Sequence, residues 1–531
     1  SEDSSPFVCA SAAACSGQSQ NTGRAHPTAA HCFQCFCIIL RPYPLWNQQY
    51  PFPLHAAAEA QTNGEESSDS GISIDTSGDE KYDVFTYRSN ADGGLTITSC
   101  DTSASSAEIP GEIEGKTVTA IGDAAFMSCS MLTSVTIPDS VTTIGESAFS
   151  SCSVLGNVTL PDGVLTLGDG AFESCTALQT VTLPDSLEKI PQAAFYQCEQ
   201  LSSVQIPDSI TEIGNEAFYS CTGLSVVTLP EHLTSIGEYA FQNCQLLTEA
   251  VIPASCTAIG NYAFDGCQAL RAFSVAEGNT AFSAPDGVLY TADGETLIRY
   301  PEAREETGYV VADTCKTLAD WSFIGSMTLE QLDLGNVTQI GEDCFYYCTA
   351  LKEITIPEGV TELPGAVFGY CLALQKVELP SSMKALGDHC FYACTKLESI
   401  TIPEGVSKLG DQCFYNCVAL LDLTLPSTIT EVGDQALGYY VSAENSQTER
   451  IGKLRVHNAG SDAVQKYLRH WKSGVYRGWI IAGVIILVAA GAVTALVLVH
   501  RSRNRIRPAS RQTAPAKENA AKKRRKESKK S

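Results

Sequence analysis

The side chains best suited to chemistry in this chain are its 22 cysteines, and their spacing is regular. Eleven of them stand three residues after a phenylalanine in a repeated unit, as Cys152 follows Phe149. Five others replace an alanine or an inward valine of that unit. The first set is Cys129, Cys152, Cys175, Cys198, Cys221, Cys244, Cys267, Cys348, Cys371, Cys394 and Cys417, and the second is Cys344, Cys390, Cys413, Cys256 and Cys315. Because thiolate chemistry needs exposure, we expect these residues to serve as small buried side chains.

We further expect most of these cysteines to be free thiols. Stacked coils lie about 4.8 Å apart, which is within the Cα range of a disulfide. Side chains at equivalent positions of stacked coils nevertheless point the same way rather than toward one another. Such a core suits an anaerobic exterior better than an oxidising one.

Metal and catalytic motifs are weak or missing in the sequence. His31, Cys32, Cys35 and Cys37 contain one CxxC pair, but a zinc site usually needs a second spaced pair. The patterns HExxH, GxSxG and GxxxxGK[ST], which organise a metal, a nucleophile or a phosphate, do not occur. We therefore expect no cofactor, no metal site and no enzyme.

The elements that position these residues follow from a 23-residue period. Phenylalanine recurs at this interval from Phe126 to Phe264, and the series resumes at Phe323 and ends at Leu437. Repeats of this length indicate a solenoid, because one coil cannot bury enough apolar surface alone. Within a unit, the alternation that ends at Ile137 predicts a half-buried strand.

The remainder of each unit predicts a turn and a short helical or 3₁₀ segment. Proline stops the strand, two apolar residues point inward again, and the Ala148–Phe149 pair lies on the short helix. Helix starts are predicted at Asp123, Asp169, Asn215, Asn261, Asp388, Asp411 and Asp434, whose types cap backbone N–H groups.

A glycine recurs just before these capping residues and gives a sharper expectation. Gly168 is one example, yet Pro191 and Pro364 occupy the same place in two other units. Proline cannot adopt positive φ. We therefore predict negative φ along the whole row, with glycine present so that two backbones can approach closely.

The pattern IGxxAFxxCxxLxxVxIPxxV resembles the BspA-like, Treponema pallidum-type class of leucine-rich repeats over about residues 95 to 440. The resemblance implies an α/β leucine-rich-repeat solenoid of 23-residue coils with a parallel sheet and short convex helices. It also implies a surface protein, because the family includes proteins implicated in adhesion to host matrix or to other cells.

Departures from the repeat divide the chain. Asp286 to Pro301 has two alternating runs around Ala292–Gly294, which predicts a β-hairpin, either a simple insertion or a binding protrusion. The predicted segments are a disordered or low-complexity 1–80, an N-terminal β cap 81–125, a first solenoid block 126–267, a hairpin insertion 268–322, a second block 323–437, a cap and stalk 438–478, a transmembrane helix 479–499 and a basic cytoplasmic tail 500–531.

The membrane segment explains the unequal charge distribution. Trp479–Val499 is uncharged and close to the roughly 20 residues that span a bilayer. Thirteen Lys or Arg against two Glu after it give +11, so the rest of this −25 chain carries −36. The positive end is expected in the cytoplasm, which predicts a single-pass cell-membrane protein with its N-terminus outside.

The outward strand positions form the candidate partner-binding face. They are small and hydroxyl-rich and lack the Trp, Tyr and Arg anchors of tight interfaces, which favours an extended, multivalent contact. The alternative is a solvated threonine row that reflects strand propensity alone. The candidates are Thr136, Thr159, Thr182, Gln205, Thr228, Thr355, Glu378, Thr401 and Thr424.

Two further rows could contribute. Acidic residues follow the repeat proline at Asp139, Asp162, Asp185, Asp208, Glu231, Glu358 and Glu404. They suit a turn, or alternatively attract calcium or basic partners. Tyrosines follow the phenylalanine at Tyr196, Tyr219, Tyr346, Tyr392 and Tyr415, as partly packed residues or as anchors for a partner.

Taken together, these features predict a membrane-anchored surface protein whose solenoid mediates adhesion or protein–protein recognition. The expected partner is an extracellular protein or glycan, and the acidic charge argues against nucleic acid. The second hypothesis is a structural envelope scaffold without a specific ligand.

Overall fold

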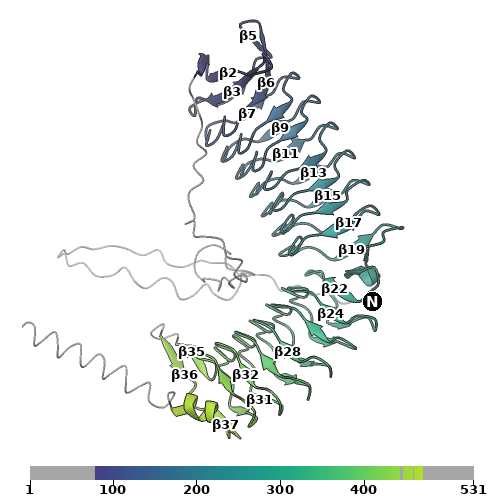
Figure 1. Ribbon diagram of the computed structural model, residues 1–531, viewed down its shortest axis with the longest axis vertical. Helices are drawn as coiled ribbons and strands as arrows, with labels where there is room; N and C mark the ends of the chain where they lie inside the picture. Colours follow the sequence, from purple (N-terminus) through teal and green to yellow (C-terminus); the bar gives the residue numbers. More distant parts are fainter. Residues whose placement is uncertain (1–77, 443–446, 459, 470–531) are drawn as a thin grey trace, which may run out of the picture. The chain divides into compact units, whose positions relative to one another are not determined.

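Each 23-residue unit forms one coil of a solenoid, and successive coils stack through parallel strands (Figure 1). The computed structural model describes residues 78–442, 447–458 and 460–469. Every regular coil contributes two strands, one of about three residues before the proline and one of two residues after it. The first was expected from the sequence. The second, at the VxxIG part of the unit, was not, because two residues are too few to show an alternation.

The three-residue strands pair in register across neighbouring coils. They are β4 Ser106–Glu108, β7 Ser134–Thr136, β9 Asn157–Thr159, β11 Thr180–Thr182, β13 Ser203–Gln205, β15 Val226–Thr228, β17 Glu249–Ile252, β19 Ala272–Val275, β23 Gly308–Val310, β25 Gln331–Asp333, β27 Glu353–Thr355, β29 Lys376–Glu378, β31 Ser399–Thr401, β33 Asp422–Thr424 and β37 Arg455–His457.

The second set of strands forms separate parallel sheets. They are β6 Lys116–Ile121, β8 Thr143–Ile144, β10 Thr166–Leu167, β12 Lys189–Ile190, β14 Glu212–Ile213, β16 Ser235–Ile236, β18 Ala258–Ile259, β22 Thr296–Arg299, β24 Thr317–Leu318, β26 Gln339–Ile340, β28 Glu362–Leu363, β30 Ala385–Leu386, β32 Lys408–Leu409 and β34 Glu431–Val432.

The predicted short convex helices are wrong. The segment around Ala148–Phe149 is a run of turns, and Ser147 and Ser151 have left-handed φ values of 52° and 61°. Its backbone N–H groups point along the stack instead of back along a helix, as where Phe126 N donates to Ala148 O at 2.7 Å. Left-handed residues interrupt a right-handed helix, and bonding between coils satisfies the groups that a helix would have satisfied internally.

The predicted helix caps therefore act differently. Asp123 Oδ1 accepts the backbone N–H of Glu146, one coil further on, at 2.9 Å, and Asp388 does the same for Asp411 at 2.8 Å. These side chains cap the next coil rather than a helix. The residue type was read correctly as a cap for backbone N–H groups, but the group that it caps lies 23 residues away and not two or three.

The glycine prediction is confirmed. No glycine of this row lies in the left-handed region, and a Cβ on Gly168 would stand 2.4 Å from the backbone of Gly145 and Glu146. On Gly145 it would meet Asp123 at the same distance. In these two coils glycine fits because the backbone or capping residue of the preceding coil occupies the space of a side chain.

Antiparallel strands close both ends of the described region. At the N-terminal end, β1 pairs with β2 and β2 with β3, and β3 then pairs in parallel with β6. At the other end β35 pairs with β36, and residues 462–469 are helical. The remaining strands of these two ends are β1 Glu80–Tyr82, β2 Phe85–Ser89, β3 Leu95–Cys100, β5 Glu112–Ile113, β35 Tyr439–Val441 and β36 Thr448–Arg450.

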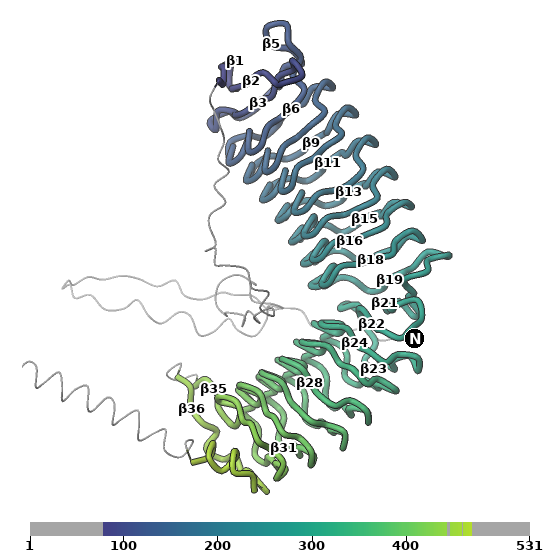
Figure 2. The backbone as a smooth tube through the Cα atoms, in the orientation of Figure 1, coloured from purple at the N-terminus to yellow at the C-terminus, as the bar shows by residue number. Residues whose placement is uncertain are grey.

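Between the two predicted blocks the chain forms an antiparallel hairpin, β21 (Leu289–Thr291) with β22, as its sequence indicated. β20 (Phe282–Ser283) and the 3₁₀ turn η1 (Pro285–Gly287) precede it. Figure 2 follows the backbone from β19 through β21 into β22. The hairpin is neither a free insertion nor a protrusion, because β22 pairs with β24 and Leu289 is fully buried.

The hairpin also separates two hydrophobic cores. One core runs from the N-terminal cap to Phe282 and Leu289, and the other starts at Val288 and Tyr290. Alternate residues of one strand thus face different cores, as strand geometry requires. We call residues 126–267 the first block, 323–437 the second block and 268–322 the junction.

Several predictions concern other parts of the chain. The His31–Cys37 cluster, the segment Trp479–Val499 and the basic tail lie outside the described residues. Within residues 78–442, 447–458 and 460–469, no helix is both long enough and apolar enough to cross a bilayer.

Candidate recognition surfaces and the junction

The candidate partner-binding face is placed by the register of the three-residue strands. Thr159, Thr182 and Gln205 are directly paired on neighbouring strands, and all three side chains are exposed. The other candidates are exposed as well, apart from Thr424, which is half-buried. The strands that carry the row form one sheet from β4 to β15 and, in the second block, belong to two sheets, β23 to β29 and β31 to β37. The role of the row in binding stays a prediction.

In the first block this face is uncharged over several coils. Each strand has another outward residue two positions before the candidate, and in four successive strands it is Ser134, Asn157, Thr180 and Ser203. Thr180 Oγ1 donates to Asn157 Oδ1 at 2.6 Å. Val226 then occupies the same position with 57% of its surface exposed. A partner would meet hydroxyl, amide and methyl groups here rather than charges.

In the second block the same face carries paired charges. Lys376 Nζ lies 2.5 Å from Glu378 on the same strand. Beyond it, Asp422 accepts from His457 at 2.7 Å and from Arg455 at 2.5 Å, and these contacts hold the pKa of Asp422 below its usual value. The blocks therefore present different chemistry at equivalent positions.

The acidic row after the proline differs between the blocks too. In the second block Glu358 accepts both the backbone N–H and the hydroxyl of Ser381, at 3.0 and 3.1 Å. These bonds lower the pKa of Glu358. In the first block, the residue after the repeat proline is acidic in five successive coils. No serine stands between two of these acidic residues, as Ser381 stands between Glu358 and Glu404 in the second block.

The tyrosine row is partly packed. Tyr196 and Tyr219 stack with ring centroids 4.7 Å apart, and Tyr392 and Tyr415 stack at 5.4 Å. Tyr415 is fully buried, whereas the others are half-buried. Their packing supports the structural interpretation more than an anchoring role.

The repeat cysteines are buried, as expected, and all described cysteines are free. Ten of the thiols that stand three residues after a phenylalanine donate to the carbonyl of the phenylalanine in the preceding coil, for example Cys221 to Phe195 at 3.2 Å. The same carbonyl oxygen also accepts the backbone N–H of Cys198, so the thiol of Cys221 uses the second lone pair of that oxygen. Burial raises the pKa of Cys221, which keeps it protonated and unreactive at neutral pH.

The bond explains why cysteine rather than alanine or valine fills this position, a reason that sequence spacing alone does not reveal. The equivalent bonds run from Cys152, Cys175, Cys198, Cys244, Cys267, Cys348, Cys371, Cys394 and Cys417. The oxidation state of these thiols in the cell remains a prediction.

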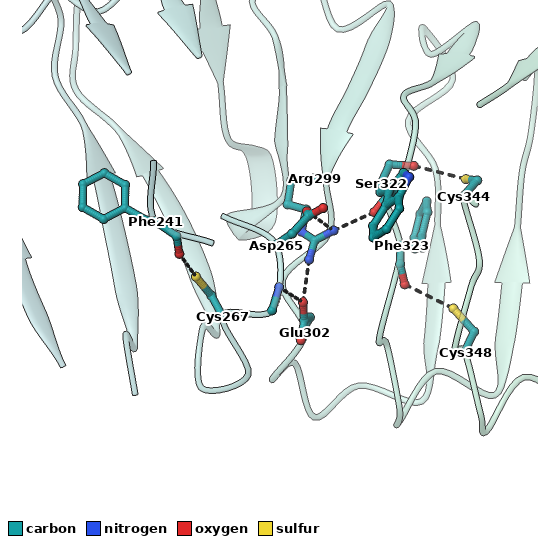
Figure 3. Close-up of polar contacts among 11 residues, drawn as sticks. Phe241, Asp265, Cys267, Arg299, Glu302, Ser322, Phe323, Cys344 and Cys348 are labelled. Carbon is teal, nitrogen blue, oxygen red and sulfur yellow. Dashed lines mark hydrogen bonds and ion pairs between the residues drawn. The ribbon is translucent and has the colours of Figure 1, made fainter. Parts of the chain in front are cut away.

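The junction contains a buried ionic triad that the sequence did not indicate (Figure 3). Arg299 contacts Asp265 at 2.8 Å and Glu302 at 2.6 Å, and it also donates to the carbonyl of Trp321 at 2.6 Å. Glu302 in turn accepts the backbone N–H of Gly266 at 2.8 Å. Asp265 and Arg299 are 5% exposed and Glu302 is 9% exposed.

Figure 3 shows that cysteine bonds flank this triad on both sides. Cys267 donates to Phe241 at the end of the first block, and Cys348 donates to Phe323 at the start of the second. The triad thus lies where one regular stack ends and the other begins.

Burial raises the pKa of both acidic residues of the triad. The pKa of Asp265 rises to about 6 and that of Glu302 to about 7, because desolvation outweighs the attraction of Arg299. Asp265 Oδ2 and Arg299 Nε have no hydrogen-bond partner among the described residues. Beside them lies a cavity of about 400 Å³, which Tyr262 and Asp320 help to line.

The repeat period continues into the junction at Tyr300. Tyr300 stands 23 residues before Phe323. Its backbone N–H donates to Ser322 O in the next coil, as the backbone N–H of Phe126 donates to Ala148 O. Its ring stacks on Phe323 at 5.0 Å. Tyrosine therefore replaces phenylalanine there, and Arg299 takes the place of the alanine that precedes it.

Among the described residues, no group of three or more His, Cys, Asp or Glu side chains is arranged to hold a metal ion.

Comparison with known proteins identifies the repeat. A model of the BspA-type leucine-rich repeat region matches residues 101–205, 188–284 and 316–443, in six copies. A leucine-rich cell surface protein of Faecalibacterium prausnitzii A2-165 is similar, with 32% identity over 69% of this chain and 96% of its own, at a TM-score of 0.59.

Two other solved structures are more distant. The pneumococcal vaccine antigen PcpA is 22% identical over 68% of this chain and 86% of its own, with a TM-score of 0.45. A leucine-rich-repeat protein of T. pallidum is 23% identical over 53% and 92%, with a TM-score of 0.22. No curated protein matches. The family match and the 32% identity show that this chain belongs to the BspA-type leucine-rich-repeat family.

Proposed function

We propose that this protein is a membrane-anchored cell-surface protein whose extracellular solenoid mediates adhesion or protein–protein recognition. The observation that carries the proposal is the in-register outward row of each block, which is exposed and built on rigid paired strands. A relative with 32% identity is a cell surface protein, which supports the location. Repeat solenoids commonly use such extended surfaces to bind proteins.

The expected binding mode is extended rather than centred on one pocket. The row from Thr136 to Thr228 offers hydroxyl and amide groups but no buried aromatic or arginine anchor. Weak contacts repeated along several coils reach useful avidity through their number. The partner proposed is an extracellular protein, with a glycan as the alternative.

Membrane attachment and orientation form part of the proposal. Trp479–Val499 has the length and composition of a single span, and the +11 segment that follows would stay in the cytoplasm. Protease treatment of intact cells tests this arrangement. Loss of the solenoid with retention of a small C-terminal fragment supports it, whereas full protection from the protease contradicts it.

Recognition is tested with the full chain displayed on cells and a panel of matrix proteins and glycans. Thr159→Glu adds a charge to the candidate face, and Thr166→Glu adds the same charge to an exposed threonine on β10 of the same coil. Saturable binding that Thr159→Glu weakens about tenfold or more, while Thr166→Glu leaves it unchanged, supports recognition through this face.

The alternative function is a structural envelope scaffold without a specific ligand. Its support is that the outward row consists largely of residues with high strand propensity, such as Thr182. No saturable binding to any member of the panel, with a mechanically weaker envelope after deletion, would favour the scaffold over recognition.

A further inference from the structure

At the junction a side-chain contact replaces one of the backbone contacts that join regular coils. Between regular coils, the N–H two residues after the phenylalanine donates to a backbone carbonyl, as Ser128 N does to Ser150 O at 2.8 Å. At the equivalent position Gly266 N donates instead to the carboxylate of Glu302. A contact that depends on ionisable side chains can respond to conditions that leave a backbone contact unchanged.

The charges of the triad do not balance when both carboxyl groups are ionised. Asp265 and Glu302 share the single guanidinium of Arg299, and all three side chains are more than nine-tenths buried. One uncompensated charge in such a place is costly. One bound proton makes the triad neutral.

We propose that the Asp265–Arg299–Glu302 triad is a proton-operated latch between the two solenoid blocks, closed when it holds at least one proton and weakened when it loses its last proton. The cavity beside the triad is lined by Asp265 and Arg299, so it gives water a route to the Asp265 carboxylate once both carboxyl groups are ionised. The orphaned Asp265 Oδ2 is then the atom that gains most from hydration.

The direction of the pH dependence follows from the raised pKa values. A carboxyl group whose pKa is higher in the closed state than in the open state binds its proton more tightly when closed. The stabilisation is therefore fully present in acid and is lost as the pH rises through about 6 to 7, the pKa values of Asp265 and Glu302.

Other ionisable groups surround the triad without cancelling this charge. Asp320 and Tyr262 line the cavity, and Asp320 adds negative charge when ionised. The thiols of Cys267 and Cys348 face the triad from the two blocks, and burial keeps both protonated, with the pKa of Cys348 raised to about 12. Arg299 is thus the cation that compensates the two carboxylates.

Hydrogen–deuterium exchange of the full chain at pH 5.5 and pH 8.0 tests the latch, after correction for the intrinsic pH dependence of exchange. We expect peptides that contain residues 262–268 and 298–304 to exchange on the order of tenfold faster at pH 8.0. Peptides from the interior of the first block, such as residues 194–206, should not change. Equal corrected rates at the two pH values in the wild-type junction would overturn the proposal.

Glu302→Gln makes the triad neutral without a proton and keeps an acceptor for Gly266. It should abolish the pH difference at the junction, whereas Glu362→Gln, an exposed carboxylate on β28, should preserve it. Asp265→Asn offers the same test through the other carboxyl group if Glu302→Gln folds poorly. A pH difference as large as that of the wild type in a folded Glu302→Gln or Asp265→Asn variant contradicts the latch.

Discussion

The two solenoid blocks share one backbone repeat and differ in what they present to solvent. Each carries 15 acidic residues, but the first block has one lysine or arginine and the second has five. In the second block the charges are locally compensated, as between Lys376 and Glu378 or Ser381 and Glu358. In the first block, Asp265 alone among the described residues forms an ion pair, and its partner Arg299 belongs to the junction.

This difference shows which part of the repeat is free to vary. The inward residues, the glycine row and the cysteine bonds are the same in both blocks because stacking depends on them. The outward strand and turn positions are not constrained in this way, so they can differ from block to block. Recognition by one block therefore need not resemble recognition by the other.

Loss of a stacked phenylalanine is expected to have the largest effect and to test whether the cores are separate. Phe218 is fully buried between two rings at 5.3 Å, and Phe391 is its counterpart in the second block. Phe218→Ala should cost about 4 kcal/mol and should raise hydrogen exchange mainly in the first block. Phe391→Ala should do so mainly in the second. Equal loss of protection in both blocks from either variant would show one cooperative core.

Removal of the junction cation should have the next largest effect and should depend on pH. Arg299→Ala leaves two buried carboxyl groups without a guanidinium, which costs about 3 kcal/mol when they are ionised. Both groups can take up protons in acid, so the loss of stability should be smaller at pH 5.5 than at pH 8.0. Denaturant unfolding at the two pH values measures this. Lys189→Ala, which removes an exposed cation of the first block, serves as the control.

The junction also differs from the two blocks in how far its structure could be predicted from the sequence. The period predicted the coil, the buried cysteines and the close approach at Gly168, because these features repeat and each copy supports the others. The triad was not predictable in the same way, because Asp265, Arg299 and Glu302 are not part of the repeated pattern and lie up to 37 residues apart in the chain. The period could have suggested Tyr300, which holds the phenylalanine position.

The helices were predicted wrongly for a different reason. Asp123 and its counterparts are good helix caps by residue type, and short apolar runs do not distinguish a helix from a series of turns. Only the position of the neighbouring coil decides where their oxygens bond. The outward face was predictable as a surface from the alternation around Val181, but its partner was not, because recognition depends on a second molecule.

The cysteine bonds should respond alike in the two blocks, since the cores are alike. Cys221→Ala and Cys371→Ala each remove a thiol donor and leave a small void, at a cost of about 1 kcal/mol. Cys221→Ser and Cys371→Ser keep a donor for the phenylalanine carbonyl and should cost less. Thermal unfolding of the four variants measures the order. A serine variant less stable than its alanine counterpart would show that the thiol serves packing alone.

The smallest effect is expected at the turn carboxylates, where the two blocks differ most in sequence. Ser381→Ala removes the hydroxyl donor from Glu358 and keeps the backbone N–H, so the lowered pKa of Glu358 should rise part of the way toward its ordinary value. A carboxyl group with a lowered pKa stabilises the folded state at pH values above its ordinary pKa. This stabilisation is lost as the pH falls through the lowered pKa of the folded state. The variant should therefore reduce stability slightly at neutral pH and not in acid. Carbon-13 titration of the Glu358 carboxyl by NMR measures the change, and Thr395→Ala, which changes a half-buried threonine that does not contact Glu358, should leave that carboxyl unaffected. An unchanged pKa in Ser381→Ala would mean that the serine does not distinguish the second block's turns from the consecutive carboxylates of the first.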